Sequence, residues 1–146
     1  MAEFYRFARL TYLQTQPFTG DRLGTYAWYY HQIHPFTERV VYLFSSARKL
    51  LSVQNAAGGA NAVPDALPSR IHGTAVAFLG LSLCARNFSE PGPADEILLF
   101  RENLLCQSRN IPVLDMILVH RGGYIPLSQM NETNGYFRNP SQQWFL

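Results

Sequence analysis

Residues 112–127, PVLDMILVHRGGYIPL, contain the clearest structural pattern in the chain. Residues 113–119 form an almost continuous apolar run with the length of one strand, and such runs are typical of strands buried on both faces. Gly122 and Gly123 then provide a turn into a second short strand at residues 124–127. The stretch therefore predicts two neighbouring strands in a sheet that is covered on both sides.

The sequence just before this stretch has the charge pattern of a helix. Residues 94–109 carry acidic residues in the first turn and Arg109 in the last, an order that suits the helix dipole. Pro112 then ends the helical pattern. Four apolar residues recur near one side, which we expect to be the buried face. They are Ile97, Phe100, Leu104 and Cys106.

Further elements precede this helix. Residues 40–44 and 50–53 are short β-branched and aromatic runs separated by a polar turn, a pattern that predicts a hairpin. Residues 55–65 are rich in Gly and Ala and predict a loop. Residues 66–85 predict a helix followed by a strand, with Gly80 near their junction. Together these elements predict an α/β or α+β domain with a central sheet.

The composition is that of a single folded domain. The 146 residues are 47% apolar and 15% charged, enough to form a core without disulfides or a structural metal. A net charge of +2 gives no argument for a polyanion partner. The most apolar stretch, residues 74–85, is too short to span a bilayer, and the N-terminus does not resemble a signal peptide. Cys84 and Cys106 belong to no Cys-x-x-Cys motif, so we expect reduced thiols in a cytoplasmic protein.

Aromatic residues are concentrated at the start of the chain. Residues 1–36 contain ten of them, without long-range helical periodicity and with Pro17 as a breaker. We expect this segment to be a wrapping arm or a self-association surface, since aromatic side chains bury large areas. Base stacking beside Arg6, Arg9 and Arg22 is the alternative, which makes a nucleic acid the second class of partner.

The end of the chain is also apolar. Residues 136–146 finish with Trp144, Phe145 and Leu146 at a terminus that is ordinarily polar and frayed. Burial of each such side chain contributes about 1.5–3 kcal/mol, so we expect them to dock. We predict a homodimer in which the first 36 residues, the last ten, or both cross the interface.

Four segments of the sequence, in this order, resemble one known domain family. They are VVYLFSSARKLLSV at 40–53, GGANAVP at 58–64, ARNFSEPGPADE at 85–96 and NIPVLDMILVHRGGYIPLSQ at 110–129. The family is the JAB/MPN metalloprotease-like domain of bacterial RadC-type proteins, and the resemblance covers residues 38–128. It implies a three-layer α/β/α fold of the cytidine-deaminase-like type. Residues 1–37 are then an aromatic arm or additional elements, and residues 129–146 are a C-terminal tail.

The chemistry implied by the resemblance is incomplete in this sequence. Active members hold zinc with two histidines and one aspartate, and a glutamate near the first strand acts as general base. Here the resemblance puts Arg86 and Phe88 at the histidine positions and Ile97 at the aspartate position. A register shifted by two residues supplies only Cys84 as a ligand. Glu38 alone corresponds to a catalytic residue, so we expect no metal, no cofactor and no hydrolase activity.

The polar residues near these positions have alternative interpretations. Arg86 can fill the vacated metal site and pair with Glu38, or Glu38 can be a solvated residue at a strand start. Asp115 lies in an apolar strand, and we expect a backbone or arginine contact if it is buried. His31 and His34 have a spacing that suits metal ligation from a helix, although no third ligand accompanies them.

We therefore weigh three functions. The leading hypothesis is a catalytically inactive RadC-like JAB/MPN domain, of a type frequent on mobile elements, that acts as a protein-binding or scaffolding module. The alternatives are a nucleic-acid accessory protein and a hydrolase with a rebuilt site that uses Glu38, Cys84 and a histidine such as His72 or His120. The residues expected to contribute to binding are Arg86, Phe88, Asp115, Trp144 and Phe145.

Overall fold

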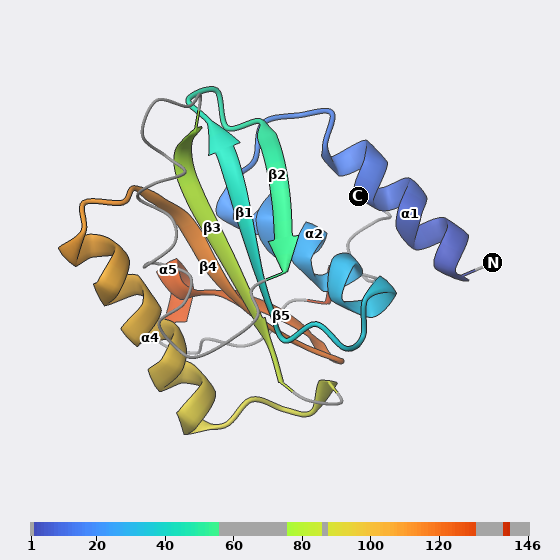
Figure 1. The fold of residues 1–146 in the computed structure, drawn as a ribbon. Coiled ribbons are helices and arrows are strands. Elements are labelled where there is room, and N and C mark those ends of the chain that lie inside the picture. Colours follow the sequence, from blue (N-terminus) through green and yellow to red (C-terminus); the bar gives the residue numbers. More distant parts are fainter. Residues whose placement is uncertain (1, 56–75, 86–87, 131–138, 141–146) are drawn as a thin grey trace.

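The computed structural model describes residues 2–55, 76–85, 88–130 and 139–140 (Figure 1). In chain order the elements are α1 (Ala2–Leu13), α2 (Gly20–Ile33), β1 (Arg39–Ser45), β2 (Leu50–Asn55), β3 (Val76–Cys84), α4 (Pro93–Ser108), β4 (Val113–His120), β5 (Gly123–Pro126) and α5 (Leu127–Met130). The expected mixed α/β class is confirmed, as are the predicted hairpin, the helix and the two strands after it.

The five strands form one sheet in the order β2-β1-β3-β4-β5. β3 and β4 run parallel, whereas every other neighbouring pair is antiparallel. A parallel pair cannot be joined by a tight turn, so α4 forms the crossover from β3 to β4. This arrangement places the carboxyl ends of β3 and β4 at the same edge of the sheet.

Helices cover both faces of the sheet (Figure 1). In β1, the side chains of Val40, Tyr42 and Phe44 join the core beneath α1 and α2. Val41 and Leu43 alternate with them and join the core beneath α4. Burial on both faces explains why this run is apolar throughout, with no polar alternation.

The N-terminal segment differs from the expected arm. Residues 2–33 contain two helices, and α2 is part of the main core, with Phe18, Tyr26 and Tyr29 buried near it. The Phe18 ring lies 5.2 Å from that of Phe44, measured between centroids. Because α2 lies between α1 and the sheet, it is buried on more than one side, and this hides the single apolar stripe by which a surface helix is recognised.

α2 lies very close to the strands beneath it. A Cβ atom on Gly24 would overlap the ring of Tyr124, and one on Gly20 would overlap the Asp115 carboxylate. Only glycine lets the helix backbone approach β4 and β5 at this distance.

The predicted buried face of α4 is wrong at three of its four residues, and only Cys106 is buried as predicted. The helix buries Leu99, Glu102 and Cys106, whereas Ile97 and Leu104 are 66% and 63% exposed. Phe100 is 37% exposed. Glu102 is only 1% exposed and forms an ion pair with Arg39 of β1, with the nearest N and O atoms 3.6 Å apart. A charged residue in the core required this partner, and sequence periodicity cannot reveal it.

Three other expectations depend on which residues the structure describes. The strand within residues 66–85 is confirmed as β3, but the helix predicted before it falls outside the described residues. Trp144 and Phe145 also lie outside them. In the part of the chain that is described, no helix has the length and apolarity needed to cross a membrane.

Candidate functional site

A crevice of about 570 Å³ opens where β3 and β4 end. Its lining residues come from the segment before β1, the end of β3 and the turn after β4: Pro35, Phe36, Thr37, Glu38, Cys84, Ala85, Phe88 and Arg121. Crevices at the carboxyl ends of parallel strands are common ligand sites in α/β proteins, because the loops there diverge. This crevice is the candidate functional site.

Backbone hydrogen bonds hold the three segments of the crevice together. The Cys84 N–H donates to the Glu38 carbonyl at 2.8 Å, and the Arg121 N–H donates to the Phe88 carbonyl at 3.2 Å. Phe88 has a φ of 54°, an uncommon conformation for a residue with a side chain. The chain therefore turns sharply here, and the crevice is built on defined backbone contacts.

The sequence-predicted residues are brought together only in part. Glu38 and Phe88, at the positions that the resemblance gives to the catalytic glutamate and a metal histidine, both line the crevice. Arg86 lies outside the described residues, and so does its predicted pairing with Glu38. Arg121 lines the crevice but was missed by sequence reasoning, although its place directly after a predicted buried strand was a usable signal.

The lining of the crevice includes the thiol of Cys84. Burial raises the pKa of the Cys84 thiol to about 12, and the charges of Glu38 and Asp95 act in the same direction. The thiol therefore stays protonated at neutral pH, and a protonated thiol is not an effective nucleophile. Within residues 2–55, 76–85, 88–130 and 139–140, no group of three or more His, Cys, Asp or Glu side chains is placed to hold a metal ion.

Asp115 lies away from the crevice, toward the start of β4. It is 7% exposed, and its carboxylate accepts hydrogen bonds from the Ser128 hydroxyl at 2.7 Å and the Met116 N–H at 2.8 Å. The Ser128 N–H donates to it as well, at 3.3 Å. The expected backbone contacts are confirmed, and these bonds give Asp115 a structural role in joining β4 to α5.

A buried polar network lies beneath the crevice. His31 of α2 has both ring nitrogens engaged: Nδ1 is 3.0 Å from the Thr37 carbonyl oxygen, and Nε2 is 2.7 Å from the Ser82 hydroxyl. The Tyr42 hydroxyl lies 2.7 Å from the same Ser82 oxygen. Because a carbonyl can only accept, His31 Nδ1 carries the proton, Ser82 donates to Nε2, and Tyr42 donates to Ser82.

This network requires a neutral His31. Burial lowers the pKa of His31 to about 4, although the bond to the Thr37 carbonyl acts in the opposite direction. Both ring nitrogens of His31 are bonded to protein groups in this structure, which leaves neither of them to pair with His34 at a metal ion. His34 is instead exposed and packs against Tyr30, with ring centroids 4.4 Å apart and the ring planes tilted by 40°.

The contact of Ser82 with His31 has the geometry of a nucleophile and its base. Both side chains are fully buried, however, so a substrate cannot reach the hydroxyl in this conformation. The network is a structural link between α2 and the sheet, and it meets the crevice through Thr37, which contributes to both. The signal in the sequence was a serine within an apolar strand, which requires a partner when it is buried.

Comparison of the sequence with protein-family models and with curated proteins gives no match.

Proposed function

We propose that the chain is a RadC-like JAB/MPN domain that has lost its metal ligands and binds a polypeptide segment of another protein in the crevice at the ends of β3 and β4. The observation that carries this proposal is the composition of that crevice. An aromatic ring, Phe88, stands where the resemblance would put a metal ligand, and the thiol in the same lining, Cys84, is protonated.

The topology supports the proposal. The mixed five-stranded sheet with helices on both faces is compatible with the three-layer α/β/α fold that the resemblance implies. The crevice also lies directly after β3, where the family places its metal-binding loop. One fold can host different functions. The position of the crevice and the missing metal ligands together favour a protein that keeps the family's fold without its metal chemistry.

The surface of the crevice suits a peptide. Phe36 is 97% exposed at the rim of the crevice. A partner that covers this large apolar side chain removes it from water, which favours binding. Glu38 and Arg121 add opposite charges to the same lining, and these can orient a bound backbone or side chain. A segment that places an apolar side chain against Phe36 and Phe88 fits this chemistry.

The test combines a metal measurement with site-directed crosslinking. Untagged protein is analysed for zinc, and a photoreactive phenylalanine analogue replaces Phe36 in cells of the native host. We expect no stoichiometric zinc and one crosslinked polypeptide whose yield falls at least tenfold when Phe88→Ala is added. The control places the same analogue at Leu51, which is 48% exposed and lies in β2 beside the end of β1, whereas the crevice lies before the start of β1. Stoichiometric zinc, or the same crosslinked polypeptide from both positions, contradicts the proposal.

The homodimer remains a prediction with its own test. Phe4 and Phe7 of α1 are 76% and 50% exposed, which leaves apolar surface on this helix for a second copy. Light scattering at micromolar concentration is expected to give twice the monomer mass, reduced to the monomer mass by a Phe4→Ser/Phe7→Ser variant. A monomeric mass for the unmodified chain contradicts it.

A further inference from the structure

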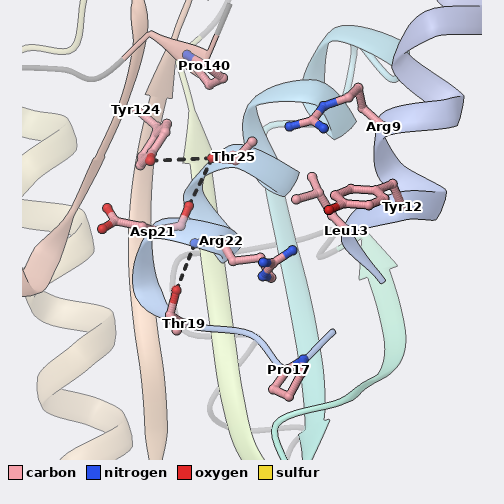
Figure 2. A pocket seen from close by; sticks show the side chains of 10 residues that line it. All are labelled: Arg9, Tyr12, Leu13, Pro17, Thr19, Asp21, Arg22, Thr25, Tyr124 and Pro140. Carbon is pink, nitrogen blue, oxygen red and sulfur yellow. Dashed lines mark hydrogen bonds between the residues drawn. The ribbon is translucent and has the colours of Figure 1, made fainter. Parts of the chain in front are cut away.

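A second groove lies between α1 and α2 and shares no lining residue with the crevice. Its volume is about 420 Å³, within the range of small-molecule sites. Figure 2 shows its lining: Arg9, Tyr12, Leu13, Pro17, Thr19, Asp21, Arg22, Thr25, Tyr124 and Pro140. Two of the three charged side chains among them are arginines, one from each helix.

Arg9 enters the groove from α1 (Figure 2). Its guanidinium carbon lies 5.6 Å from the centre of the Tyr12 ring and 5.9 Å from that of Tyr29. These rings hold the guanidinium in place through its face, which leaves its edge for hydrogen bonds. The Nε atom of Arg9 is buried without a hydrogen bond of its own among the described residues, although the Tyr29 hydroxyl interacts with the guanidinium group.

Arg22 enters from the first turn of α2. One terminal nitrogen donates to the Gln16 side-chain oxygen at 3.0 Å, while the other, Nη1, is buried without an acceptor among the described residues. Asp21 is the carboxylate in the lining, and Figure 2 shows it pointing away from both guanidinium groups. Two partly buried cations thus share one groove while the neighbouring anion faces elsewhere.

We propose that this groove binds the phosphate group of a small phosphorylated molecule, held between Arg9 and Arg22. Buried donors without acceptors are rare in proteins, and Nη1 of Arg22 therefore indicates an acceptor outside the described residues. Guanidinium groups match phosphate oxygens in geometry, and a doubly charged phosphate can accept from both arginines at once. The half-exposed ring of Tyr12 is available to the group attached to the phosphate.

The first test is calorimetric titration of the full chain with inorganic phosphate at constant ionic strength. We expect saturable binding of one phosphate per chain and an affinity reduced about tenfold or more in both Arg9→Gln and Arg22→Gln. Arg101→Gln, which removes an exposed arginine on α4, is the matched control and is expected to bind like the unmodified protein. Acetate is titrated in parallel and is expected to bind at least tenfold more weakly, because it carries a single charge.

The second test needs no variant and covers the case in which a substitution disturbs folding. In NMR spectra of the unmodified protein, phosphate is expected to shift the Nε–Hε signals of Arg9 and Arg22 and to leave that of Arg101 unchanged. Equal shifts at all three arginines, equal binding by Arg101→Gln and Arg22→Gln, or acetate binding as tight as phosphate binding overturns the proposal. Absence of any saturable binding overturns it as well.

Discussion

Acidification should destabilise the protein through His31. The folded state holds this imidazole neutral, with a pKa of about 4, whereas an unfolded chain protonates it near the ordinary value of 6.5. Below pH 6.5 the unfolded state therefore binds more protons than the folded state, and stability falls as the pH falls. The contribution is fully present above pH 6.5 and is lost progressively down to pH 4.

The magnitude follows from the separation of the two pKa values. A shift of this size corresponds to a total of about 3 kcal/mol, of which about 2 kcal/mol is lost between pH 7.5 and pH 5. The groups that face the imidazole are the Thr37 carbonyl, the Ser82 hydroxyl and the rings of Tyr30 and His34. None of these is a carboxylate that could stabilise a protonated His31.

The assay is urea unfolding followed by tryptophan fluorescence at pH 7.5 and pH 5, for the unmodified chain and for His31→Gln. Glutamine does not titrate, so the difference between the two pH dependences isolates His31 from the carboxylates. His34→Gln is the control and is expected to retain the full loss. NMR titration of the His31 ring in the unmodified protein gives its pKa directly. A value near 6.5, or an equal pH dependence with and without His31, refutes the reasoning.

Three further outcomes are expected. Ser82→Ala leaves two buried polar groups without their shared partner and should lower the free energy of unfolding by about 2–5 kcal/mol, measured in urea, whereas the same change at the exposed Ser108 should cost less than about 0.5 kcal/mol. Gly24→Ala should lower it by about 2 kcal/mol or more, because the added methyl group overlaps the Tyr124 ring; a stabilised variant in thermal unfolding would contradict the packing. In a variant that lacks the other cysteine, the Cys84 thiol should react with a disulfide reagent at pH 8 about a thousandfold more slowly than in denaturant, and equal rates would show an accessible thiolate.

Local patterns were sufficient to predict the strands and the crossover helix. The run at residues 113–119 and the turn at Gly122 have few alternatives, because a continuous apolar stretch of that length between breakers suits a buried strand. The hairpin of β1 and β2 follows from similarly local information. Glu38 and Phe88 were chosen as site residues from the order of segments that resemble a known domain family, and both line the crevice.

The remaining features depend on contacts between distant residues. Glu102 is buried because Arg39 of another element lies beside it, and this pairing moves the buried face of α4 away from Ile97 and Leu104. His31 meets Ser82 across 51 positions of sequence. The identity of a polar residue does not decide whether it is buried, because the free energy of burying it depends on the hydrogen bond or ion pair that it makes. The sequence by itself determined where the chain extends, coils and turns, and the tertiary structure decided which polar groups enter the core and which apolar groups remain outside it.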